Sequence, residues 1–175
     1  MTLQTYRRFC ADRSGASALE FAMVAAPLIL LLLAVFQVGI VYFANFSLEG
    51  ATDRGARLIR TGQAQAKGFS AEQFKNEVCK YLVAPLTCTG LKLDVRSYPS
   101  FAGAGSNLTE PMGSDGNLKS NFDYKPGVGG DVVVVRAFYP LDIGSVLPAS
   151  ISLSNMAGNS RLIVATAAFR NEPFK

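Results

Sequence analysis

Histidine is absent from the whole sequence of 175 residues. Its absence excludes zinc sites of the Cys/His type and catalysis by a Cys–His pair. The sequence also lacks a Gly-x-Ser-x-Gly turn, a phosphate-binding loop and a Gly-x-Gly-x-x-Gly motif that opens a helix after a strand. Carboxylate pairs assembled from distant positions remain an open route to catalysis. We nevertheless expect a protein that is not an enzyme and that binds no cofactor.

Charged residues are scarce, at 17% of the chain against about 25% in an average soluble domain. The net charge is +4, but the basic residues are spread along the chain and form no dense run interleaved with aromatic residues. The nearest approach to a cluster is Arg54, Arg57 and Arg60, whose helical spacing after an apolar run is typical of a solvated, membrane-flanking face. We therefore predict no nucleic-acid partner.

One apolar run dominates the N-terminal third of the chain. No charged residue occurs from Phe21 to Leu48, and Gln37 is the only strongly polar residue from Phe21 to Ala44. A helix over this shorter stretch would be about 36 Å long, enough to cross a hydrocarbon core of about 30 Å. The alternative is a buried core helix, but such helices are usually shorter and carry a polar face. The run predicts one membrane-spanning helix, with the lipid bilayer as a partner.

The segment before the apolar run, residues 1–15, is polar and contains arginine. A secretory signal has a shorter apolar stretch that ends in a small-residue cleavage site. Here the small residues, Gly15 and Ala16 among them, come before the apolar run. A protease that cut between Gly15 and Ala16 would remove the leader and leave the helix in the membrane.

Glu20 lies at the very edge of the apolar helix, where an ionised carboxylate is costly unless it is paired. Cleavage before Ala16 would give that residue a free α-amino group and would make Glu20 the fifth residue of the mature chain. The carboxylate and the ammonium could pair within one subunit or between neighbours, which would fix axial register. A glutamate that only marks the membrane boundary explains the position equally well.

The three cysteines fall on both sides of the apolar run: Cys10 precedes it, and Cys79 and Cys88 follow it. In an oxidising compartment the second and third would form a disulfide, and closing so short a loop contributes about 2.5–3 kcal/mol. Two separate buried thiols are the alternative. Basic residues flank the membrane run on both sides, so the positive-inside rule alone does not decide the orientation.

The stretch from Gly15 to Phe21, Gly-Ala-Ser-Ala-Leu-Glu-Phe, resembles the processing site of type IV prepilins. The wider block, from about Ser14 to Arg57, resembles the TadE-like pseudopilins of tight-adherence (Tad, Flp-type) pilus systems. The matching features are Pro27 in an Ala/Leu-rich run, then Gly39, then Tyr42, then the Ala-x-x-x-Gly-Ala-Arg motif of residues 51–57. Gln37 departs from the pattern, because many relatives carry a glutamate there.

The resemblance implies a substrate of a prepilin peptidase, cut after Gly15, that serves as a minor pilin in the assembly of an adhesive pilus. Its partners would be the peptidase, other Tad pilins and the inner-membrane assembly platform. The N-terminus would be cytoplasmic and the C-terminal domain periplasmic. An uncleaved single-pass inner-membrane anchor that presents a periplasmic binding or scaffold domain needs the same helix and stays the alternative.

Beyond the membrane, the helix is expected to continue as a stem to about Gly62. Its small and apolar residues Leu48, Ala51, Gly55 and Ile59 share one face. This face could pack on a partner, but packing on the chain's own domain is the simpler interpretation. The predicted organisation is a leader (residues 1–15), a transmembrane helix and stem (residues 16–62) and a periplasmic domain (residues 63–175).

A second helix is predicted from a capping box at Ser70 and Gln73, with Phe69 and Phe74 in the positions of a hydrophobic staple. Pro85 is expected to stop this helix. Three strands are predicted after it, over residues 91–96, 131–139 and 162–169. The first alternates apolar and charged residues and should be half-buried; the second contains four consecutive valines and should be central, with Pro140 ending it. The expected fold class is therefore α+β, with a mostly antiparallel sheet of about three strands.

Residues 99–130 are rich in Gly, Ser, Asn and Pro and form too long a stretch for an ordinary connection. A solvated, flexible loop is the expectation. The side-chain oxygens of Asp115, Asn117, Asn121 and Asp123 could bind calcium, but their spacing does not match an EF-hand, and we predict no metal site.

Overall fold

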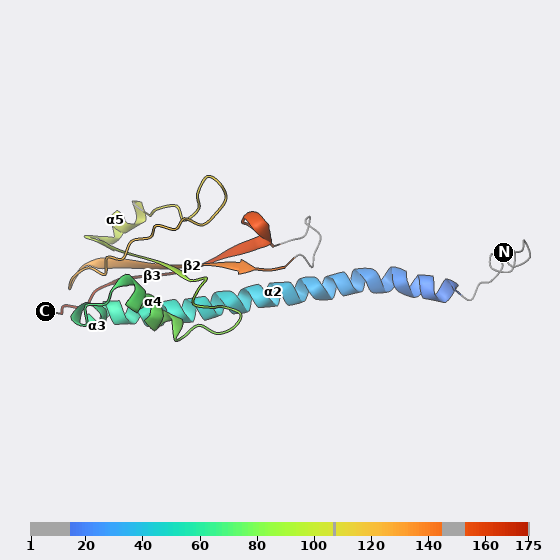
Figure 1. Cartoon of the computed structure of the whole chain (residues 1–175), viewed down its shortest axis with the longest axis horizontal. Coiled ribbons are helices and arrows are strands. Elements are labelled where there is room, and N and C mark those ends of the chain that lie inside the picture. The colour runs from blue at the N-terminus through green and yellow to red at the C-terminus, as the bar shows by residue number, and fades with distance from the viewer. Residues whose placement is uncertain (1–14, 107, 145–152, 175) are drawn as a thin grey trace, which may run out of the picture. The chain divides into compact units, whose positions relative to one another are not determined.

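A computed structural model describes residues 15–106, 108–144 and 153–174 (Figure 1). Its helices and strands are, in chain order, α2 (Ala16–Arg60), α3 (Gln63–Ala66), α4 (Ala71–Cys79), β1 (Lys92–Tyr98), α5 (Phe101–Ser106), β2 (Val132–Asp142), η2 (Ala157–Asn159, a 3₁₀ turn) and β3 (Ser160–Arg170). The predicted α+β class is confirmed. The chain divides into two compact units at a boundary between Gln37 and Val38, inside α2. The leader predicted at residues 1–15 lies outside the described residues except for Gly15, as does Cys10.

The sheet is antiparallel and has the strand order β1-β2-β3, so β2 is central, as predicted. Val135 marks the register, because it lies opposite Val95 on β1 and Ala167 on β3. Every residue of β2 from Val132 to Tyr139 is buried. The consecutive valines therefore form a strand that is covered on both faces, which is what an unbroken apolar run requires.

Pro140 does not end the central strand, and the prediction that it would is wrong. β2 continues to Asp142, with Pro140 opposite Leu162. The backbone N–H of Leu162 donates to Asn155 Oδ1 at 2.7 Å. It therefore does not donate to Pro140 on β2. β1 pairs with β2 only as far as Phe138. Proline is tolerated here because its missing N–H faces the side on which β2 has no neighbouring strand.

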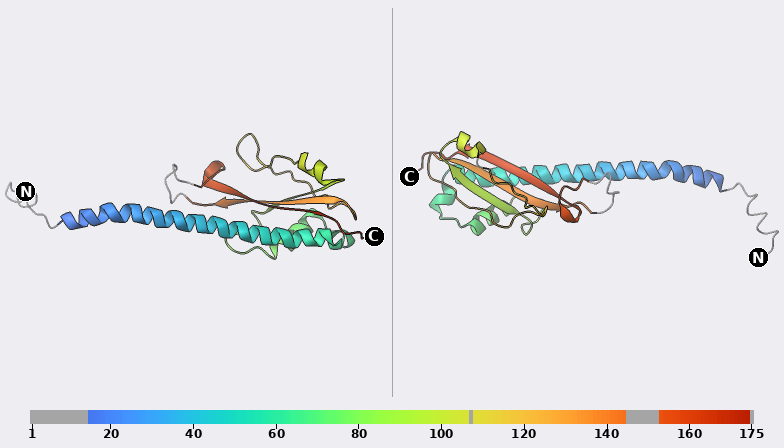
Figure 2. Two further views of the ribbon diagram at one scale, coloured as in Figure 1. Left: turned by 180° about the vertical axis from the view of Figure 1, so that it is seen from behind. Right: turned by 90° about the horizontal axis from the view of Figure 1, so that it is seen from above.

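The part of α2 within the second unit packs along one face of the sheet (Figure 2). Its predicted stripe is buried: Leu48 and Ile59 are 0% exposed and Ala51 is 1% exposed. A Cβ added to Gly55 would lie 2.5 Å from Val78 Cγ2 on α4, so glycine is needed for the close approach of these two helices. The stem therefore packs on the chain's own domain, which was the simpler interpretation of the stripe.

The capping box predicted for the second helix is present at the N-terminus of α4. Gln73 N–H donates to Ser70 Oγ at 3.2 Å, and Ser70 N–H donates to Gln73 Oε1 at 2.9 Å. The helix ends at Cys79, however, and not near Pro85 as predicted. The next turns are tighter i→i+3 turns, and Val83 N–H then donates to Ser47 Oγ on α2 at 3.0 Å. This contact with α2 keeps residues 80–83 from continuing the α-helix, so α4 ends before Pro85 is reached.

The segment between β1 and β2 covers the second face of the sheet (Figure 2). Ala104 on α5 packs with Val132 and Val134, and the ring of Phe122 stacks on that of Phe138 with centroids 5.1 Å apart. The loop expected between residues 99 and 130 thus contains a short helix and shields part of the core. Its predicted flexibility stays a prediction.

Candidate functional site

The predicted cleavage site lies at the point where α2 begins. Gly15 is in a turn, Ala16 is the first residue of the helix, and Leu19 N–H donates to the Gly15 carbonyl at 3.1 Å. Both Gly15 and Ala16 are exposed. A Cβ added to Gly15 would meet no atom within 4 Å, and the residue is not among those with positive φ. The fold itself therefore has no need of glycine at this position.

Glu20 lies on the exposed surface of α2, and it shares a helix face with Ala16 because the two are four residues apart. The helix therefore brings together the two residues that were predicted to pair. No ion pair to Glu20 occurs among the residues that the structure describes. The carboxylate is thus available to a group outside the chain, or to the amino group that cleavage would create at Ala16.

The first compact unit displays an almost continuous apolar surface. The exposed large apolar residues of this stretch of α2 are Leu19, Phe21, Met23, Val24, Leu28, Ile29, Leu30, Leu31, Leu32, Val35 and Phe36. In α2 only 11% of the most apolar 18-residue window is buried, and the helix is long and apolar enough to cross a membrane. A core helix of a soluble protein would bury most of such a surface, whereas lipid or neighbouring helices would cover it here.

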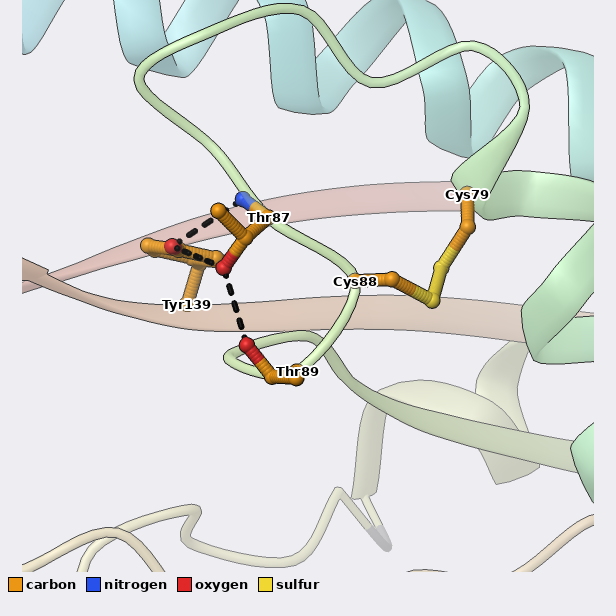
Figure 3. The surroundings of a disulfide bond; sticks show 5 residues. All are labelled: Cys79, Thr87, Cys88, Thr89 and Tyr139. Atoms are coloured by element: carbon orange, nitrogen blue, oxygen red, sulfur yellow. Dashed lines mark hydrogen bonds between the residues drawn. A yellow bond between two sulfur atoms is a disulfide. The ribbon is translucent and has the colours of Figure 1, made fainter.

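The predicted disulfide between Cys79 and Cys88 is present, with the two Cα atoms 5.3 Å apart (Figure 3). It ties the end of α4 to the segment that leads into β1. Next to it, Thr87 N–H donates to Tyr139 Oη at 3.1 Å, and the hydroxyl groups of Thr87 and Tyr139 are 3.2 Å apart. The disulfide and these hydrogen bonds fix the same loop to two different elements, α4 and β2.

Residues 15–57 match the model of the TadE-like protein family. The match begins at the glycine of the predicted cleavage site and covers almost all of α2. Neither the curated proteins nor the solved structures contain a significant match to the chain. The chain carries a TadE-like segment. The resemblance predicted from the sequence is thereby confirmed over this segment.

The TadE-like segment accounts for α2 alone, and the helices and strands after it fall outside the match. Within the segment, Gln37 is 8% exposed although the residues before it are mostly exposed. An amide at this position is uncharged, so its burial needs no counter-ion. A glutamate at this position would have to find a positive partner or become protonated.

A buried charge pair on the sheet was missed from the sequence. Arg136 Nη2 on β2 donates to Asp94 Oδ2 on β1 at 2.6 Å, and Asp94 is only 1% exposed. Arg96 Nε lies 3.0 Å from the same carboxylate, and the Asp123 N–H donates to it at 3.0 Å. Asp94 was predicted on the solvent face of a half-buried strand, which is wrong because the segment after β1 folds over that face. An arginine directly after the four valines, within the same apolar strand, was the signal that could have revealed the pair.

The surroundings of Asp94 set its pKa. Burial alone would raise the pKa, but the hydrogen bonds from Arg136, the Asp123 amide and Arg96 outweigh burial and hold the pKa below its usual value. The pKa of Arg96 is raised: burial acts to lower it, but its hydrogen bond and attraction to Asp94 are stronger. The carboxylate therefore stays ionised at neutral pH and stabilises the contact between β1, β2 and the covering segment.

Both aspartates considered for calcium are engaged in other contacts. Asp115 accepts hydrogen bonds from Asn117, and Asp123 pairs with Arg96 and Lys125 at 3.5 Å each. Within the described ranges, no group of three His, Cys, Asp or Glu side chains could hold a metal ion. Tyr124, from the same segment, packs its ring on Phe74 with centroids 5.4 Å apart, and burial raises its pKa to about 12. The residues near β1 thus serve packing and charge pairing.

Proposed function

We propose that this protein is a TadE-like minor pilin that a prepilin peptidase cuts after Gly15 and that takes part in assembling an adhesive Tad-type pilus. It acts structurally and not as an enzyme. The apolar part of α2 is anchored in the inner membrane with the N-terminus cytoplasmic, and the α+β domain is periplasmic. Its partners are the peptidase, the lipid bilayer, other Tad pilins and the inner-membrane assembly platform.

The observation that carries this proposal is the position of Gly15. It is the first residue of the TadE-like match and directly precedes the apolar helix. Because the surrounding space is open and the backbone is not in the left-handed region, the fold would accept another residue there. A glycine that the fold does not require is well explained by recognition by an enzyme.

The disulfide supports the proposed orientation. Disulfides persist in oxidising compartments such as the bacterial periplasm and are rare in the cytosol. Cys79 and Cys88 lie after the apolar helix, so their bond favours a domain outside the cytoplasm. With one membrane crossing, the leader would then lie on the cytoplasmic side.

Replacing Gly15 by valine tests the processing step. The Gly15→Val variant should accumulate as the uncut chain in membranes, which intact-mass measurement would detect. Gly50→Val is the matched control, because Gly50 is also exposed, lies on α2 and has no atom within 4 Å of an added Cβ. If wild type, variant and control all have the mass of the uncut chain where the peptidase is active, the protein is a permanent membrane anchor and the proposal fails.

A further inference from the structure

One exposed face of α2, in the second compact unit, carries two acidic residues followed by two basic residues. These residues, Glu49, Asp53, Arg57 and Arg60, are here called the charged face. Their spacing of four, four and three residues places them on one side of a helix. All four are exposed, whereas the buried stripe of α2 points toward the sheet. The charged face is therefore directed away from the core of its own domain.

The charges of this face are hardly used within the chain. Glu49, Asp53 and Arg57 make no salt bridge with any residue in the described part of the chain. Arg60 Nε lies 3.5 Å from Glu172 Oε1, but both side chains are about half exposed, at 49% and 56%. Exposed pairs of this kind are weak and exchange readily for other partners.

The surface beside the charged face is hollowed, so that a neighbour could approach it closely. Asp53, Arg57 and Arg60 line a cavity of about 360 Å³ together with Ala56 and with residues 167–169 of β3. A second cavity, of about 210 Å³, is lined by Glu49, Thr52, Asp53, Ala165 and Thr166. Three alanines, Ala56, Ala167 and Ala168, line the first cavity, and their short side chains leave it open. No strand pairs with the outer edge of β3 among the described residues.

We propose that the charged face binds the charged face of a second copy of this chain, parallel to the first and shifted along α2 by about two helical turns. Asp53 and Arg60 are seven residues apart and Glu49 and Arg57 are eight apart, so a shift on the order of 11 Å brings acidic residues beside basic ones. At zero shift each charge would instead meet its own kind.

The arrangement of the charges favours a second copy over an unrelated partner. A partner with a surface of one sign would meet like charge on half of this face, whereas a shifted copy meets only opposite charge where the two faces overlap. An antiparallel pair would also match the charges. Copies that enter an assembly from one membrane through the same end of α2 run in the same direction, which excludes the antiparallel pair, and in this respect the inference rests on the proposed function.

A shifted contact of this kind is head-to-tail. The basic half of one copy receives the acidic half of the next, which leaves a free acidic half and a free basic half at the two ends of the row. Further copies can therefore be added with the same contact. The charged face would in this way set the axial register between successive subunits.

Charge reversal in the full chain tests the contact. Two differently tagged copies are expressed together, and their co-purification from detergent-solubilised membranes is measured. Reversing the acidic half (Glu49→Lys with Asp53→Lys) or the basic half (Arg57→Glu with Arg60→Glu) should lower co-purification about tenfold, because attraction becomes repulsion. Combining one copy of each variant, or reversing all four charges in one chain, should restore it.

The matched control reverses two exposed charges elsewhere, Glu72→Lys on α4 with Lys92→Glu on β1, and should leave co-purification unchanged. Restoration by the mixed pair also shows that the variants are folded. The proposal is overturned if reversing either half has no effect, or if the mixed pair binds no better than either variant does with itself. High salt should weaken the wild-type contact, because the screening length falls from about 10 Å at 0.1 M to about 3 Å at 1 M.

Cysteine cross-linking tests the shift. In a chain with Cys10→Ser, the variant Asp53→Cys with Arg60→Cys should give a ladder of multimers on mild oxidation, because Cys79 and Cys88 are already paired. Each single-cysteine variant should remain monomeric. Dimers from the single variants would show an unshifted contact, and a double variant that stops at dimers would show an antiparallel pair; either result overturns the proposal.

Failure of this inference can be told apart from failure of the proposed function. The mass of the chain in the same preparations reports cleavage after Gly15 independently of association. If the chain is cut but its association does not depend on the charges, the minor-pilin proposal stands and the proposed contact through the charged face is rejected. If the chain is uncut but forms cross-linked multimers that depend on the charges, the contact stands and the minor-pilin proposal is rejected.

Discussion

The two parts of α2 belong to one helix, yet their side chains are distributed in opposite ways. Before Gln37 the large apolar residues are exposed, with Phe21 at 74% and Phe36 at 70%. After Val38 the apolar residues form a buried stripe, with Leu48 and Ile59 at 0%. A continuous helix thus passes from a surface suited to lipid to a face suited to a protein core. The comparison indicates that the two parts of α2 are stabilised in different ways. Surroundings outside the chain stabilise the part in the first unit, and tertiary packing stabilises the part in the second.

The largest expected difference between the two parts comes from removing an aromatic ring. Phe74→Ala should lower the free energy of unfolding of the C-terminal domain by about 3–5 kcal/mol, because it leaves a cavity in the fully buried core. Phe21→Ala removes the same group from an exposed site and should leave domain stability nearly unchanged. Urea unfolding of the full chain in detergent would measure both. Equal losses would show that the first unit also packs against a core.

Breaking the buried charge pair should have the next largest effect. Arg136→Met leaves the Asp94 carboxylate buried with only Arg96 to neutralise it, at an expected cost of about 3 kcal/mol. Arg170→Met, at an exposed position on β3, is the control and should change little. The same unfolding measurement applies. A loss below about 1 kcal/mol for Arg136→Met would mean that Arg96 and the Asp123 amide together satisfy the carboxylate.

Removing the disulfide should cost somewhat less. Cys88→Ser opens a short loop, and the chain-entropy relation predicts a loss of about 2.5 kcal/mol under oxidising conditions. Thermal unfolding with and without reductant would check this prediction. Reductant should lower the melting temperature of the wild type to near that of the variant. An unchanged melting temperature in the variant would show that the hydrogen bonds of Thr87 to Tyr139 hold the loop without the covalent bond.

Acid should act through Asp94 and produce the smallest effect. In the folded protein the pKa of Asp94 is lowered from the usual 3.8. The ionised carboxylate therefore contributes its full stabilisation above pH 3.8, and this stabilisation is lost as the pH falls from 3.8 toward and through the pKa of the folded state. In a series of melting temperatures measured between pH 7 and pH 3, the decline that is due to Asp94 should therefore begin at about pH 4 and continue at lower pH. In Asp94→Asn this part of the decline should be missing. A variant that keeps the full decline would assign it to other carboxyl groups.

Patterns carried by neighbouring residues were predictable from the sequence. The capping box at Ser70 and Gln73 is local, and the four β-branched valines from Val132 to Val135 favour a strand that is buried on both faces. The apolar length of α2 and the motifs at its two ends likewise lie within one stretch of chain, which is why the TadE-like segment could be identified.

The predictions that failed depend on contacts between distant residues. The end of α4 is set by Ser47 on another helix, and the position of Pro140 is permitted by the length of β1. Asp94 is buried because a segment that reads as a solvated loop folds over it. Neither the partner strand nor the covering segment is visible in the local sequence around these residues.

N-terminal sequencing of the protein purified from membranes of its native host tests the central claim most directly. We predict that the chain begins at Ala16 with the sequence Ala-Ser-Ala-Leu-Glu, which would put the amino group four residues before Glu20 on the same helix face. A chain that begins at Met1 or Thr2, although an active prepilin peptidase is present, would contradict the claim. The protein would then be a permanent membrane anchor, and the pairing proposed for Glu20 would have no amino group to pair with.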